Sequence, residues 1–99
     1  MSNSKKITIL LADDHPVVRS GLRALLEQEP DMRVVGEAGD GREAIAKVRE
    51  RPPDVLVMDI SMPGLNGIEA PREITREFPA TRVVALSVHS SGQFIKDMF

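Results

Sequence analysis

The stretch that decides the fold is Asp54-Val55-Leu56-Val57-Met58-Asp59-Ile60, followed by Ser61-Met62-Pro63-Gly64-Leu65-Asn66-Gly67. Its first half is almost wholly apolar, which is typical of a strand buried on both faces of a parallel sheet. Its second half is rich in residues that form turns. Together the two halves predict a buried strand over 54–60, with Asp59 near its carboxyl end, and then a loop.

Segments of the same apolar kind recur along the chain and alternate with segments of helical periodicity. The first periodic segment predicts a helix with one buried face, which would be formed by Val18, Leu22, Leu25 and Leu26. Alternating strands and helices form a parallel sheet with helices on both faces and right-handed crossovers. The predicted strands are 7–12, 33–38, 54–60 and 82–87, and the predicted helices are 16–28, 41–51, 68–78 and 91–99.

Length and composition predict one globular domain over 1–99, with 1–6 as a flexible tail. The chain has 13 basic and 15 acidic residues, a balance that argues against a nucleic-acid-binding surface. It has no cysteine, which excludes disulfide frameworks and thiolate metal sites. The apolar run at 7–12 is too short for a membrane span or a signal peptide. We therefore expect a cytoplasmic protein with no membrane partner.

Carboxylates stand at the ends of two predicted strands, Asp13 and Asp14 after the first and Asp59 at the end of the third. If the strands lie in the order 2-1-3-4, the first and third are neighbours about 4.8 Å apart. Three carboxylates this close require a proton or a cation, and Mg²⁺ is the ion that such oxygen ligands favour. The alternative is that Asp13 caps the following helix and Asp14 is solvated.

Three polar residues lie beside these strand ends. Ser87 ends the fourth predicted strand, where its hydroxyl would bond either a phosphoryl oxygen or the nearby backbone. His15 is interpreted as a polar residue at a helix start, with no direct part in the chemistry. His89 is interpreted as an exposed loop residue beyond the fourth strand.

At this point the motifs resemble a known family. Three motifs carry the resemblance, and they are Leu-Ala-Asp-Asp-His-Pro at 11–16, Met-Asp-Ile-Ser-Met-Pro at 58–63 with Gly67, and Leu86-Ser87. Together they resemble the receiver domain of bacterial two-component response regulators. The Asp-Asp-His-Pro motif followed by Val-Val-Arg-Ser-Gly-Leu at 17–22 resembles the NarL-type subgroup, whose members usually carry a LuxR-type helix-turn-helix behind the receiver. The resemblance extends from Lys6 to about Phe99.

The resemblance implies a flavodoxin-like, doubly wound α/β fold and a role for each matching residue. Asp59 would be the phosphoacceptor. Asp13 and Asp14 would hold Mg²⁺ together with the backbone carbonyl of Ser61, and Ser87 would be the switch hydroxyl. The phosphoryl donor would be a sensor histidine kinase. The protein would be a switch that is phosphorylated once and slowly loses the group, and not a turnover enzyme.

The sequence also departs from the family. It ends at Phe99, before the fifth strand, the fifth helix and the lysine that a receiver domain carries after that strand. The DNA-binding domain is absent too, so we expect a fragment of a longer transcription regulator that itself contacts no nucleic acid. Strand four would then be an open edge with unpaired backbone groups. We expect this edge to permit homodimers or the exchange of segments between chains.

Three other classes of protein fit the sequence less well. A magnesium-dependent hydrolase with an aspartyl-phosphate intermediate commonly needs a second aspartate two residues after the nucleophile, where this chain has Ser61. A receiver-like module that is not phosphorylated would be expected to lose one of its three aspartates. A flavin or nucleotide binder needs backbone donors for phosphate, whereas Gly39-Asp40-Gly41 is not a phosphate-binding loop and carboxylates follow the first strand.

Overall fold

The computed structural model describes residues 6–59, 69–89 and 92–96. Strands and helices alternate along most of this length, as the hydrophobic pattern predicts. The strands are β1 (Ile7–Ala12), β2 (Met32–Ala38), β3 (Val55–Asp59), β4 (Arg82–His89) and β5 (Gly92–Lys96), and the helices are α1 (Pro16–Glu27), α2 (Gly41–Glu50) and α3 (Glu69–Glu77).

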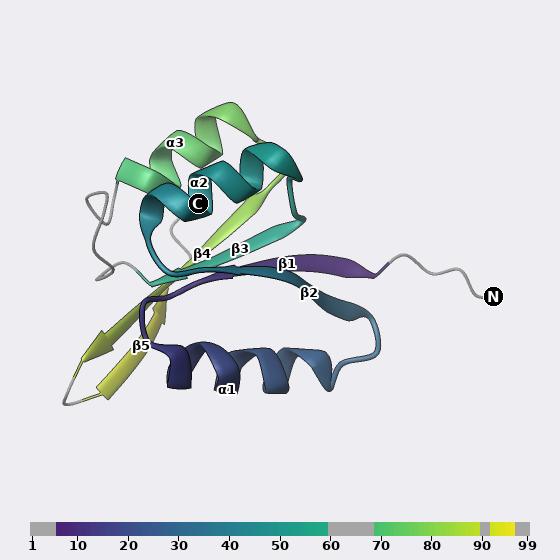
Figure 1. The fold of residues 1–99 in the computed structure, drawn as a ribbon, viewed down its shortest axis with the longest axis vertical. Coiled ribbons are helices and arrows are strands. Elements are labelled where there is room, and N and C mark those ends of the chain that lie inside the picture. Colours follow the sequence, from purple (N-terminus) through teal and green to yellow (C-terminus); the bar gives the residue numbers. More distant parts are fainter. Residues whose placement is uncertain (1–5, 60–68, 90–91, 97–99) are drawn as a thin grey trace.

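The strands form one sheet in the order β2-β1-β3-β4-β5. The pairs β1–β2, β1–β3 and β3–β4 are parallel, which confirms the predicted order 2-1-3-4 and the α/β class. Helix α1 covers one face of the sheet, while α2 and α3 lie together on the other face (Figure 1). None of the described helices is both long and apolar enough to cross a membrane.

Local sequence signals explain where the helices begin. Pro16 is the first residue of α1, where the N–H that proline lacks would have no partner within the helix. Asp40 caps α2, because its side chain accepts a hydrogen bond of 2.8 Å from the backbone N–H of Glu43. The Glu43 carboxylate in turn accepts from the N–H of Gly39 at 2.7 Å. Asp40 and Glu43 thus form a reciprocal capping arrangement, with the return bond one residue upstream of the cap.

The core consists of two clusters, one on each face of the sheet. The larger cluster lies under α2 and α3, where Leu56 of β3 and Ile74 of α3 are both fully buried. The smaller cluster lies under α1 and joins Ile9 and Leu11 of β1 to Val34 of β2. Alternate residues of β1 therefore serve opposite faces, which is why its sequence is a continuous apolar run.

The prediction for the buried face of α1 is partly wrong. Leu22 and Leu26 pack against the smaller cluster, but Leu25 is 63% exposed. No residue of α1 is fully buried. Beside the helix, the same face of the sheet has an apolar cavity of about 310 Å³ lined by Ile7, Ile9, Leu22, Leu26, Met32, Val55, Val57, Val84 and Leu86.

The predicted helix over 91–99 is also wrong for the residues that the structure describes there. Residues 92–96 form β5, which pairs antiparallel with β4 and places Ile95 opposite Leu86. β-branched and aromatic residues favour a strand, and pairing satisfies the outer backbone groups of β4 that a helix would leave open. The expected open edge of strand four is therefore occupied, which removes the basis for homodimers or segment exchange through it.

Other predictions at the ends of segments have mixed outcomes. The predicted loop position of His89 is wrong, since β4 continues to that residue. Helix α3 lies inside the predicted range 68–78, and Pro71 falls in its first turn, where no helical hydrogen bond is lost. Some predicted segments lie outside the described residues. These are positions 1–5 of the predicted tail 1–6, the loop 61–67 and positions 97–99 of the last predicted helix.

The pairing of β1 with β2 contains an irregularity. Ile9 pairs with Val34, but Leu10 pairs with Gly36, so Val35 is an extra residue in β2. A Cβ atom at Gly36 would lie only 3.0 Å from the side chain of Leu10, so glycine allows the two strands to approach closely after the bulge.

Two arginines of α1 bind the same carboxylate of β2. Arg19 Nε donates to Glu37 Oε1 at 2.7 Å, and Arg23 Nη1 donates to Glu37 Oε2 at 2.5 Å. The hydrogen bond from Arg23, followed by that from Arg19, holds the pKa of Glu37 below its ordinary value. This network ties α1 to the sheet where apolar burial of the helix is incomplete.

Glu37→Gln is expected to lower the free energy of unfolding at neutral pH by about 1 kcal/mol, because both hydrogen bonds lose a charged acceptor. A carboxyl group whose pKa is lowered by folding stabilises the fold above its ordinary pKa of 4.5, and the contribution is lost as the pH falls through the lower, folded value. In urea titrations, the difference between wild type and variant should therefore shrink on acidification.

Glu27→Gln is the matched control for this prediction. It alters only a 3.6 Å ion pair with Arg23 on the surface of α1 and should change the free energy of unfolding by less than about 0.5 kcal/mol. A difference between wild type and Glu37→Gln that is independent of pH would contradict the proposed role of the carboxylate charge.

Candidate metal centre

The carboxyl ends of β1 and β3 bring three carboxylates together. Asp13 directly follows β1, and its N–H donates to the carbonyl of Ala38 at 2.9 Å, which extends the pairing with β2. Asp59 is the last residue of β3. Both aspartates are only 1% exposed, while Asp14 is exposed. These three carboxylates and the His15 ring each offer one ligand atom, and the four atoms lie within 4.8 Å of one another.

A backbone hydrogen bond orients the Asp13 carboxylate. Its Oδ1 accepts from the N–H of His15 at 2.7 Å, across two residues of the turn into α1. Its Oδ2 is buried and has no hydrogen-bond partner in the part of the chain that the structure describes. A buried carboxylate oxygen without a partner is costly unless a cation or a donor reaches it. The carboxylate is therefore held in place with one oxygen available for a ligand.

His15 is the site residue that the sequence prediction missed. It is the N-cap residue of α1, as expected, but its side chain makes no capping bond. Instead its Nδ1 lies 3.0 Å from Asp13 Oδ1, 2.9 Å from Asp14 Oδ1 and 3.8 Å from Asp59 Oδ2. The hydrogen bond to Asp13 and the charge of Asp14 raise the pKa of His15 above its ordinary value. The signal in the sequence was a histidine directly after two strand-end carboxylates.

Arg19 supports the centre from the first turn of α1 and was also missed by the sequence prediction. Its Nη1 donates to the backbone carbonyl of Asp13 at 2.5 Å, while its Nε binds Glu37. One guanidinium group therefore joins the loop after β1 to both α1 and β2. This contact fixes the backbone that carries the buried carboxylate, and no periodicity in the sequence indicates it.

The residues present fit a hard divalent cation. Carboxylate oxygens are the ligands that Mg²⁺ prefers, and two buried carboxylates whose ligand atoms lie within 4.8 Å repel one another without a compensating charge. The buried Oδ2 of Asp13 supplies an unused ligand atom beside Asp14 and Asp59. The alternative in which Asp13 caps the following helix is not what the structure shows, because His15 occupies the N-cap position of α1.

Two predicted site residues are placed only in part. Ser61 lies outside the described residues. Ser87 lies in β4, one residue after Leu86, which pairs with Asp59 of the neighbouring strand. The backbone of Ser87 therefore stands at the same end of the sheet as the carboxylates. The prediction that Ser87 ends the fourth strand is wrong, because β4 continues to His89.

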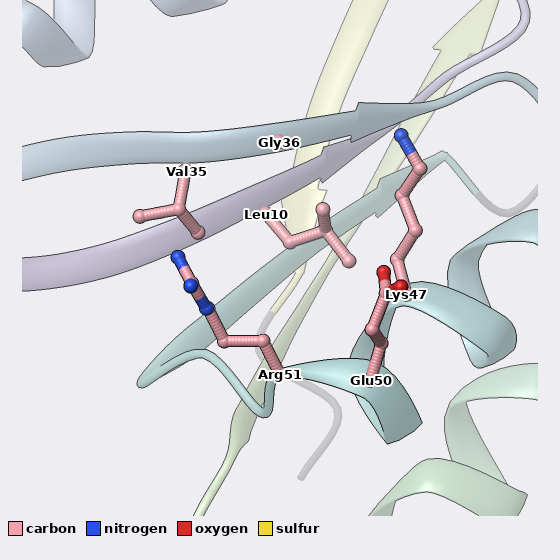
Figure 2. A pocket seen from close by; sticks show the side chains of 6 residues that line it. All are labelled: Leu10, Val35, Gly36, Lys47, Glu50 and Arg51. Carbon is pink, nitrogen blue, oxygen red and sulfur yellow. The ribbon is translucent and has the colours of Figure 1, made fainter.

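A second hollow, of about 350 Å³, lies between β2 and α2 (Figure 2). The Lys47 side chain extends along it, and Lys47 Nζ donates to the carbonyl of Glu37 at 2.6 Å. The residues that line the hollow are Leu10, Val35, Gly36, Lys47, Glu50 and Arg51. None of the clustered carboxylates is among them, so this hollow is separate from the candidate metal centre.

Comparison with known proteins supplies the family. The model of the response regulator receiver domain matches residues 9–99. The chain is 42% identical over 93 residues to the uncharacterized transcriptional regulatory protein YxjL of Bacillus subtilis, covering 94% of this chain and 43% of that protein. It is 41% identical over 88 residues to the nitrate/nitrite response regulator protein NarL of Escherichia coli K12, covering 89% of this chain and 41% of that protein.

Solved structures agree with the sequence relatives. The response regulator domain of Thermotoga maritima CheB superposes with a TM-score of 0.78 at 46% identity, covering 84% of this chain and 61% of that one. The receiver domain of the putative response regulator NarL from Mycobacterium tuberculosis gives a TM-score of 0.80 at 34% identity, covering 88% and 70%. The chain spans less than half the length of the curated relatives it matches. By sequence and by fold, the chain belongs to the response regulator receiver domain family.

Proposed function

We propose that this receiver domain is a phosphorylation switch in which Asp59 accepts a phosphoryl group and Asp13 and Asp14 hold Mg²⁺. The observation that carries the proposal is the clustering of the three carboxylates within 4.8 Å at the carboxyl ends of adjacent parallel strands. Asp59, which is buried at the end of β3, is the proposed nucleophile.

The proposed transfer makes one bond and breaks one. A carboxylate oxygen of Asp59 attacks phosphorus, the bond between phosphorus and the donor nitrogen of a phosphohistidine breaks, and an acyl phosphate remains on the protein. A bound Mg²⁺ would offset the charge of the transferring group. Asp13 keeps its orientation through the N–H of His15, and Arg19 holds the backbone behind it. Water later hydrolyses the acyl phosphate.

The remaining parts of the site are also included in the proposal. The backbone carbonyl of Ser61 would add a ligand for Mg²⁺, and the Ser87 hydroxyl would bond the phosphoryl group and report its arrival. Support for Ser87 comes from its place in β4 next to Leu86, the residue that pairs with Asp59. Each domain is phosphorylated on itself, so the proposal describes a switch and not a turnover enzyme.

The proposed partners follow from the family and from the relatives. The donor would be a sensor histidine kinase, and in a longer chain the switch would control a DNA-binding output domain. Several relatives are named transcriptional regulatory proteins or response regulators, which supports that output. A transcription regulator acts where the chromosome lies, so the proposal includes a cytoplasmic location. The receiver residues themselves would not contact nucleic acid.

Intact mass spectrometry after incubation with acetyl phosphate and Mg²⁺ tests the proposal. We expect one phosphoryl group on the wild-type chain and none on Asp59→Asn or in the presence of a chelator. Asp31→Asn, which changes an exposed aspartate outside the cluster, is the matched control and should be phosphorylated like the wild type. Equal phosphorylation of wild type and Asp59→Asn, or none of the wild type, would overturn the assignment.

A further inference from the structure

We propose that His15 is a nitrogen ligand of the metal centre and that it shifts the preference of the centre from Mg²⁺ toward Mn²⁺. The inference rests on the proposed metal site and adds a ligand of a different chemical class to it. An all-oxygen site suits Mg²⁺, whereas imidazole nitrogen is a ligand that transition metal ions accept more readily. The mixed oxygen and nitrogen set of this chain therefore favours Mn²⁺ more than three carboxylates alone would.

The distances within the cluster match those between neighbouring ligands of one ion. Two neighbouring ligands of an octahedral ion with bonds of about 2.1 Å lie about 3.0 Å apart. Nδ1 of His15 is 3.0 Å from Asp13 Oδ1 and 2.9 Å from Asp14 Oδ1. The ring nitrogen thus stands where a ligand adjacent to both carboxylates of the acidic pair would stand.

The ring of His15 is also held at the site. The backbone N–H of His15 binds Asp13 Oδ1, which ties the residue to the same carboxylate that its ring approaches. The side chain of His15 is 53% exposed, so an ion can reach the ring from solvent past the residues that the structure describes. The Nδ1 atom of His15 points at the carboxylates of the cluster. The His15 side chain makes no capping hydrogen bond to the start of α1.

The buried carboxylate of Asp13 independently indicates a ligand at the cluster. Asp13 is 1% exposed, and its Oδ2 has no hydrogen-bond partner among the described residues. Oδ1 of the same group is already bonded to the N–H of His15. An ion bound between Nδ1 of His15 and the carboxylates would give the buried oxygen a partner.

The test measures the binding of Mn²⁺ and Mg²⁺ by titration calorimetry to wild type, His15→Asn and His89→Asn. Asparagine is a favoured N-cap residue, so His15→Asn should fold, and a thermal melt verifies this. His89 is the other histidine of the chain and serves as the matched control. We expect the ratio of Mn²⁺ to Mg²⁺ association constants to fall by about tenfold in His15→Asn and to be unchanged in His89→Asn.

A spectroscopic measurement gives a second readout that does not depend on phosphorylation. Electron spin echo spectra of bound Mn²⁺ should show modulation from a directly coordinated imidazole nitrogen in wild type and His89→Asn, and should lose it in His15→Asn. An unchanged affinity ratio in His15→Asn, or an equal fall in His89→Asn, would overturn the inference.

The outcomes also separate this inference from the proposed function. A wild-type chain that binds neither ion would refute the metal centre on which both statements rest. Binding of both ions with a ratio that His15→Asn does not change would refute only the role of His15. Phosphorylation of the wild type with Mg²⁺, abolished in Asp59→Asn, would support the proposed function whichever ligand set the ion uses.

Discussion

Leu56→Ala is expected to lower the free energy of unfolding by about 3–4 kcal/mol, because it leaves a cavity in the centre of the sheet that the neighbours cannot fill. Leu56 is fully buried in β3. It pairs with Leu10 on one side and with Val83 on the other, so both adjacent strands hold its backbone in place. For a chain of this size the loss is a large part of the total stability.

Urea titration followed by far-ultraviolet circular dichroism measures this loss. Leu25→Ala is the matched control, since it makes the same chemical change at a position that is 63% exposed. It should alter the free energy of unfolding by less than about 0.5 kcal/mol, because alanine is also a good helix former. Similar losses in the two variants would show that Leu56 does not pack as described.

Asp13→Asn is expected to remove most of the stabilisation that Mg²⁺ gives to the fold. If the ion binds only the folded chain, a concentration one hundred times the dissociation constant adds about 2.7 kcal/mol to the free energy of unfolding. The variant loses one of the two buried carboxylates of the cluster. In the presence of chelator it should be more stable than the wild type, because charge repulsion with Asp59 disappears.

Thermal melts of both proteins with Mg²⁺ and with chelator measure the two effects together. Asparagine retains an Oδ1 that can accept the N–H of His15, so the turn into α1 should persist. Asp31→Asn is the control for a change of net charge and should respond to Mg²⁺ like the wild type. An equal response of Asp13→Asn to Mg²⁺ would exclude Asp13 as a ligand.

The strands and the carboxylate edge were predictable because they depend on local composition and on a general rule of parallel sheets. A strand buried on both faces must be a continuous apolar run, as at 7–12 and 54–60. The carboxyl ends of adjacent parallel strands meet at one edge, which brings Asp13 and Asp59 together whatever the side chains between them. The predicted order 2-1-3-4, which makes these two strands neighbours, is the order observed for β1 to β4.

The errors arose where distant parts of the chain decide the outcome. Leu22 and Leu26 are four residues apart and pack against the sheet, whereas Leu25 is turned by about 100° from Leu26 around the helix axis. Residues 92–96 pair with β4, and no local periodicity shows that this edge needs a partner. The ring of His15 points at the cluster in an arrangement that depends on the fold of the strand ends.

The bulge at Val35 bears on how the chain behaves at high concentration. β2 is an outer strand, and outer strands are the sites where sheets of different molecules join and fibrils grow. An extra residue twists the strand and interrupts the regular spacing of donors and acceptors that an incoming strand would have to match. Arg33 and Glu37 also place charges along this strand. Colloidal stability on this side of the molecule thus draws on the irregular backbone of β2 as well as on these side-chain charges.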